Sequence, residues 1–91
     1  MTYIIVSDHA RARSFQRLGT DSLLLIRRLW REGKRVSKAE MRGFNNTPYI
    51  RGYVYRIANY ANGRVLIVAA PMGLGIKVVT VIWRPLERGE E

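Results

Sequence analysis

The chain has 91 residues, no cysteine and a single histidine, and its 16 Lys and Arg against 7 Asp and Glu give a net charge of +9. This length allows one small domain with a modest core. The missing cysteines exclude disulfides and thiolate metal sites, so we expect neither a metal nor a cofactor. Thirteen of the cations are Arg, whose planar guanidinium grips phosphate with two hydrogen bonds. This composition favours RNA, another nucleic acid or an acidic protein as partner.

The chain shows no segment for export or for membrane insertion. The N-terminus lacks the charged leader and small-residue cleavage site of a signal peptide. The apolar runs are too short to span a bilayer. We therefore expect a soluble, cytoplasmic protein without a membrane partner.

The first part of the chain predicts a short strand followed by a helix. Residues 2–6 (TYIIV) are β-branched and aromatic, as is typical of a strand. Ser7 or Asp8 can cap a helix over residues 9–18, and Gly19 is placed to end it.

A second helix is predicted directly after the first. Over Leu23–Glu32 the apolar residues recur at helical spacing, while the arginines of this segment point elsewhere. Gly33 is well placed as its C-terminal glycine. Because so few residues join the two helices, we expect an antiparallel helical hairpin.

The rest of the chain predicts a loop and then three strands. Residues 34–48 have the composition of an exposed loop, with room for a short strand or a helical turn. Strands are predicted over residues 49–59, 64–70 and 76–83, joined by turns at 60–63 and 71–75. The last two strands are apolar on both faces. We therefore expect one of them to be central, and a partner chain, as in a homodimer, to close one face of the sheet.

These elements predict an α+β fold of order β-α-α-β-β-β. Residues 1–85 would form one domain, with an antiparallel four-stranded sheet and the helical hairpin packed on one face. The first strand would lie next to the last one. Residues 86–91 would form a charged tail.

The first helix carries a candidate catalytic group. His9, Arg13 and Arg17 stand at i, i+4 and i+8, and so share one helix face. Metal-free RNA cleavage needs a group that exchanges a proton and cations that hold the phosphate. His9 suits the first role and the two arginines the second. Thr80 on the last strand could donate a hydrogen bond to the same phosphate.

Further basic and aromatic residues are candidates for nucleic-acid contacts, through charge or through base stacking. They are Arg11, Arg51, Tyr53, Tyr55, Arg56, Arg64, Lys77 and Arg84. A structural interpretation of the same residue types stays open. In it, His9 bonds to Asp8 or to backbone at the helix start, and the arginines of the first helix form a solvated face. Thr80 is then an ordinary strand residue, and the tyrosines pack in the sheet.

Two segments resemble a known superfamily. SDHARARSFQR (residues 7–17) and KVVTVIWR (residues 77–84), with this order of elements, resemble the RelE/ParE toxins. They are closer still to a small uncharacterised bacterial and phage family of that fold, which begins with Ser-Asp-His-Ala and spaced arginines. The resemblance implies a toxin: RelE-like members cleave mRNA on the ribosome, whereas ParE-like members bind gyrase. The C-terminal catalytic residues of RelE proteins have no clean match in IWRPLERGEE.

Three functional hypotheses follow. In the first, the protein is a toxin-like, metal-independent endoribonuclease with His9 at its centre, held in check by an antitoxin. In the second, it is a non-catalytic, phage-encoded protein that binds and inhibits a host protein or nucleic acid. The third, general nucleic-acid binding without cleavage, follows from charge alone and predicts an affinity that falls steeply with salt.

Overall fold

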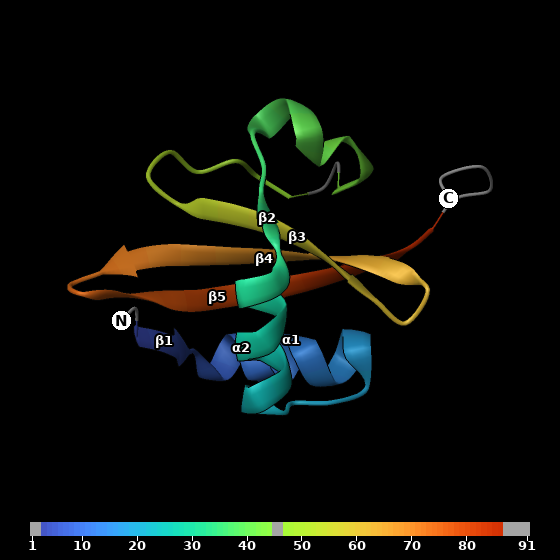
Figure 1. The fold of residues 1–91 in the computed structure, drawn as a ribbon, viewed down its shortest axis with the longest axis horizontal. Helices are drawn as coiled ribbons and strands as arrows, with labels where there is room; N and C mark the ends of the chain where they lie inside the picture. The colour runs from blue at the N-terminus through green and yellow to red at the C-terminus, as the bar shows by residue number, and fades with distance from the viewer. Residues whose placement is uncertain (1–2, 45–46, 87–91) are drawn as a thin grey trace.

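Five strands form one mixed sheet in the computed structural model, which describes residues 3–44 and 47–86 (Figure 1). The strands are β1 (Tyr3–Val6), β2 (Lys34–Arg35), β3 (Val54–Tyr60), β4 (Gly63–Met72) and β5 (Gly75–Pro85). Their order in the sheet is β1-β5-β4-β3-β2. The α+β class is confirmed, and so is the place of the first strand beside the last.

Two details of the sheet differ from the sequence-based expectation. The two-residue strand β2 adds a fifth strand, paired antiparallel to β3. β1 runs parallel to β5, so the sheet is mixed rather than antiparallel. No hairpin joins β1 to β5, because most of the chain lies between them. Turn geometry therefore does not fix their relative direction.

Both helices form where the sequence predicts them. In α1 (Asp8–Leu18), the Ser7 hydroxyl accepts a hydrogen bond of 3.0 Å from the amide of Ala10. Gly19 ends the helix in the left-handed conformation, with φ 76°. This conformation costs a glycine little. The second helix, α2, spans Leu23–Glu32, as expected.

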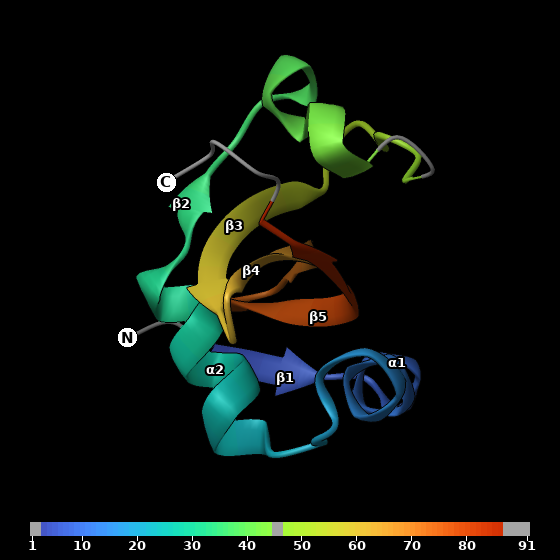
Figure 2. The ribbon, with the colours of Figure 1, turned by 90° about the vertical axis from the view of Figure 1, so that its right-hand side faces the viewer.

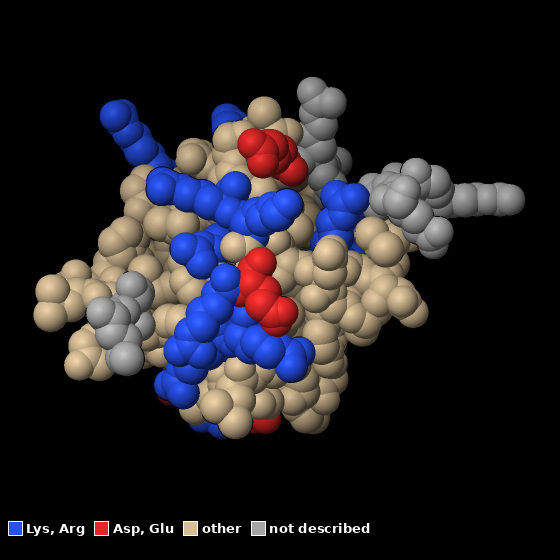
Figure 3. Space-filling view, viewed as in Figure 1, with Lys and Arg blue, Asp and Glu red and all other residues tan. Residues whose placement is uncertain are grey.

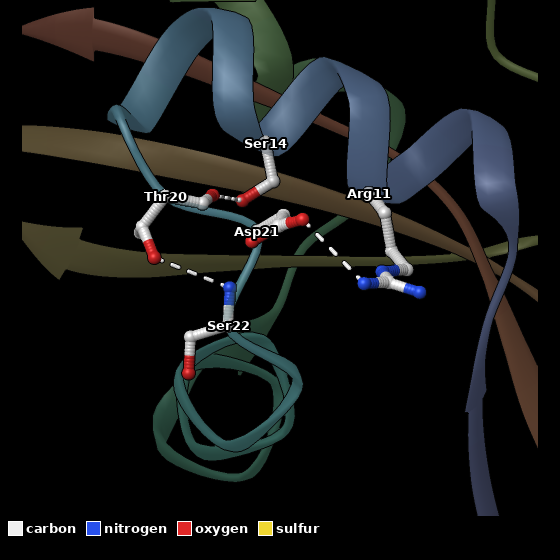
Figure 4. A network of polar contacts seen from close by, with 5 residues as sticks. All are labelled: Arg11, Ser14, Thr20, Asp21 and Ser22. Carbon is white, nitrogen blue, oxygen red and sulfur yellow. Dashed lines mark hydrogen bonds and ion pairs between the residues drawn. The ribbon is translucent and has the colours of Figure 1, made fainter.

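The predicted antiparallel helical hairpin is wrong. α2 runs across the direction of α1 instead of back along it (Figures 1 and 2). α1 packs on β5, whereas α2 packs on β3 and β1. The connection between the helices is held by side chains (Figure 4): the hydroxyl of Ser14 donates to the carbonyl of Thr20 at 2.5 Å, and Arg11 pairs with Asp21 at 3.5 Å. The short link keeps the two helices close together in the chain. The angle between them follows from the different strands on which they pack.

The sheet is covered on both faces by this chain itself. On one side, α1 and α2 enclose a core that includes Ala10, Ile26, Val65, Ile67 and Val81. On the other side, the 3₁₀ segment η1 (Lys38–Phe44) places Met41 and Phe44 against Tyr55, Leu66 and Val68. Residues 34–48 are therefore more than an exposed loop. The apolar faces of β4 are accounted for without a partner chain, since β4 lies between two cores.

The hairpins confirm the predicted turns with shifted strand ends. β3 begins at Val54 rather than at residue 49. Ala61 and Asn62 join β3 to β4 with φ of 49° and 59°, the two-residue turn that fits the twist of a hairpin. A Cβ at Gly63 would collide with the Trp83 indole, whose Nε1 donates to the Tyr60 carbonyl at 3.0 Å.

Two remaining expectations concern the membrane and the tail. None of the described helices is long and apolar enough to cross a membrane. Of the predicted tail, only Leu86 lies within the described residues, where its amide donates to the carbonyl of Asn62 at 3.1 Å.

Candidate nucleic-acid interface

The predicted catalytic residues of α1 share one helix, but two of the three make contacts within the fold. His9 is exposed in the first turn. Arg13 Nη1 donates to the side-chain oxygen of Gln16 at 3.1 Å. Arg17 Nη1 donates to the carbonyl of Val81 at 2.7 Å, on the part of β5 that β1 does not pair with. Partial burial, and then the nearby charge of Arg13, lower the pKa of Arg17 below its usual range. Arg17 therefore satisfies a backbone carbonyl at the open edge of β5.

Thr80 does not join this group. It pairs with Val68, whose side chain belongs to the core on the η1 side. Directly paired residues of antiparallel strands point to the same face, so Thr80 faces away from α1. The register shift next to Val68 sets this orientation, because Ala69 pairs with Val78 and leaves Val79 as an extra residue.

The predicted tyrosines are occupied by packing. Tyr55 is 1% exposed, and its ring stacks on Tyr49 with centroids 4.9 Å apart. Its hydroxyl donates to the carbonyl of Pro48 at 3.1 Å and accepts from the amide of Ile50 at 2.7 Å. Tyr53 packs against the core on the η1 side. A base cannot stack on the buried ring of Tyr55.

The predicted basic residues lie on several surfaces. Arg11 pairs with Asp21, and Arg84 lies over the Phe44 ring at 5.8 Å. Arg51 and Lys77 are exposed at separate places, in a turn and on β5. Of these residues, Arg56 and Arg64 line two pockets that adjoin each other on one side of the molecule.

The larger of these pockets, which we call the arginine cleft, has a volume of about 730 Å³. Residues of α2 and of the strands β1, β2, β3 and β5 line it: Ile4, Trp30, Arg31, Arg35, Val54, Arg56 and Ile76. The lining thus consists of three arginines and four apolar residues. No carboxylate is among these described residues. Lys and Arg side chains gather over α2 and β2 on this face (Figure 3).

Arg56 is held firmly in the arginine cleft. Its Nη1 donates to the carbonyl of Trp30 at 2.8 Å, and its guanidinium carbon lies 4.3 Å from the centroid of the Trp30 ring. Its Nε is buried and has no hydrogen-bond partner among the described residues. The cation is therefore fixed in place before any ligand arrives.

Arg31 and Arg35 differ from Arg56 because their side chains are exposed to solvent. Within residues 3–44 and 47–86, neither side chain makes a hydrogen bond or an ion pair. Their charges are available to an anion in the cleft that Arg56 also lines.

A second pocket, of about 430 Å³, adjoins the arginine cleft because Arg35 lines both. We call it the acidic pocket after its two carboxylates, although its cations outnumber them. Its other lining residues are Glu32, Lys34, Val36, Glu40, Ile57, Ala58, Asn59 and Arg64. It therefore combines three cations with two carboxylates and one amide. Among the described residues, no three His, Cys, Asp or Glu side chains are placed to hold a metal ion.

Our sequence interpretation missed Trp30, Arg31 and Arg35 as site residues. It placed Trp30 on the apolar face of the second helix, where it is indeed 4% exposed, and said only that the arginines of α2 point away from that face. The one signal was the adjacency of Trp30 and Arg31 at the end of a helix. The decisive feature is the pairing of Arg35 with Arg56, which joins residues far apart in the chain.

No protein-family model, curated protein or solved structure matches this chain.

Proposed function

We propose that the protein binds single-stranded RNA through the arginine cleft. The observation that carries this proposal is the convergence of Arg31, Arg35 and Arg56 on one concave site without a carboxylate. Guanidinium groups bind phosphate oxygens in pairs of hydrogen bonds, so three of them suit a phosphodiester. The net charge of +9 supports the same ligand class.

The apolar lining supports an unpaired base rather than a duplex. Ile4, Val54 and Ile76 form the apolar part of the arginine cleft, and Trp30, which is 4% exposed, lies under the Arg56 guanidinium. A base that is splayed out of a single strand can enter such a pocket, whereas a base stacked in a duplex cannot.

The test is binding of a fluorescein-labelled RNA decamer, measured by fluorescence anisotropy over a range of salt concentrations. We expect the double variant R31Q/R35Q to bind at least about tenfold more weakly. The slope of log K against log salt should fall by about 1.4, since each lost phosphate contact on a single strand removes about 0.7. Duplex RNA and single-stranded DNA serve as competitors.

The matched control is R11Q/R13Q, which removes the same charge from α1. We expect it to weaken binding by less than about threefold, through net charge alone. Equal losses in the two double variants would show that the arginine cleft is not the site. Absence of RNA binding at low salt, with capture of an acidic protein instead, would replace RNA by a protein ligand.

RNA cleavage centred on His9 is a second candidate function. The observation in its favour is the exposed position of His9 in the first turn of α1, one turn before Arg13. Incubation of the purified protein with RNA, with and without EDTA, would detect metal-independent cleavage. We expect H9A to abolish cleavage while RNA affinity stays unchanged. Cleavage by H9A at the wild-type rate would overturn this mechanism.

A further inference from the structure

The acidic pocket differs in chemistry from the arginine cleft beside it. The arginine cleft offers cations and apolar surface, whereas the acidic pocket also contains Glu32, Glu40 and Asn59. The cations of the acidic pocket can bind phosphate, whereas its carboxylates repel it. Carboxylate and amide oxygens do accept hydrogen bonds from the amino groups of nucleobases.

Both carboxylates keep unused acceptor capacity. Glu32 Oε1 pairs with Arg28 at 3.2 Å, and Glu40 Oε1 accepts from the hydroxyl of Ser37 at 3.2 Å. An ionised carboxylate has about four lone-pair sites. In the part of the chain that the structure describes, the Oε2 atoms of both residues accept no hydrogen bond. Two acceptors are thus available in one pocket.

Arg35 connects the two pockets. Because its side chain lines both, a phosphate bound by Arg35 lies between them. A nucleotide attached to that phosphate then has its base at the acidic pocket, while the strand continues through the arginine cleft. This arrangement separates backbone binding from base recognition, as is usual in nucleic-acid interfaces.

We infer that the acidic pocket reads a nucleobase with an exocyclic amino group, through Glu32 and Glu40. This inference rests on RNA binding by the arginine cleft. Cytosine presents its N4 amino group as a donor to the carboxylates. Uracil presents an acceptor oxygen at the same position and is disfavoured there, since two acceptors oppose each other. The pocket therefore gives the protein a preference among pyrimidines that charge alone does not provide.

The test compares two labelled hexamers, r(C)6 and r(U)6, by anisotropy at one salt concentration. Both are pyrimidine strands with equal phosphate charge, so a difference reports the base. We expect r(C)6 to bind about tenfold more tightly than r(U)6. In the E40Q variant, r(U)6 should bind more tightly because a negative charge is lost, and the ratio should fall toward one. E32Q should shift the ratio in the same direction.

The control is D21N, which makes the same charge change at an exposed residue outside both pockets. It should raise both affinities slightly and leave their ratio unchanged. Equal binding of r(C)6 and r(U)6 by the wild-type protein would overturn the inference, as would an unchanged ratio in both E40Q and E32Q. Neither outcome contradicts RNA binding by the arginine cleft. That proposal fails separately, if R31Q/R35Q leaves the affinity for both hexamers intact, if R11Q/R13Q lowers it equally, or if the wild-type protein binds no RNA at low salt.

Discussion

Arginines recur at short intervals both in α1 and around the arginine cleft, but the two groups differ in their hydrogen bonds within the protein. On α1, Arg11, Arg13 and Arg17 each bond to an oxygen of the same chain, at 3.5, 3.1 and 2.7 Å respectively. In the arginine cleft, Arg31 and Arg35 make no such bond within the described residues. The difference shows that regularly spaced arginines indicate a binding surface only where their guanidinium groups do not already donate to oxygens of the same protein.

Arg56 combines both roles, and its variant should show the largest effect. R56M keeps the apolar stem but removes the hydrogen bond to the Trp30 carbonyl and the contact with the Trp30 ring. We expect the free energy of unfolding to fall by about 2 kcal/mol. RNA affinity should also fall. Urea unfolding monitored by tryptophan fluorescence measures the first effect and anisotropy the second.

If R56M loses stability but keeps its RNA affinity, then Arg56 has a structural role only, as the arginines of α1 do. The comparison between the two regions would then rest on Arg31 and Arg35 alone.

Arg17 should affect stability without affecting binding. R17M removes the donor to the Val81 carbonyl, which lies on an edge of β5. We expect a loss of about 1 kcal/mol in the free energy of unfolding, a typical value for a partly buried hydrogen bond. Urea denaturation measures it. A tenfold loss of RNA affinity, with unchanged stability, would instead support the phosphate-binding role predicted from the sequence.

The smallest effect is expected for Arg11. Its pair with Asp21 spans 3.5 Å, and both side chains are about half exposed. Exposed pairs contribute little, so R11Q should change the free energy of unfolding by less than about 0.5 kcal/mol. Thermal unfolding at low and high salt is the measurement. A larger change that disappears at high salt would assign the pair a role in fixing the link between α1 and α2.

The helices and turns could be predicted because their signals are local. Ser7 and Gly19 bracket α1 through contacts with residues only a few positions away. Ala61 and Asn62 form the hairpin turn for the same reason. Part of the candidate site was predictable too, since Arg56 and Arg64 were among the expected contacts. In residues 34–44 the expected short strand and helical turn are present as β2 and η1, but the segment was predicted to be exposed. The burial of Met41 and Phe44 was missed because they pack against the distant strands β3 and β4.

The sequence by itself determined the α+β class, the two helices, the hairpins and the strong positive charge, since backbone sterics, periodicity and composition act locally. Only the tertiary structure decided the parallel pairing of β1, the crossing of α1 and α2, and the face on which Thr80 lies. It also decided the site, because the arginine cleft depends on the pairing of Arg35 with Arg56 and on the Trp30 ring between helix and sheet. Such contacts join distant segments, and the packing of the whole chain selects them.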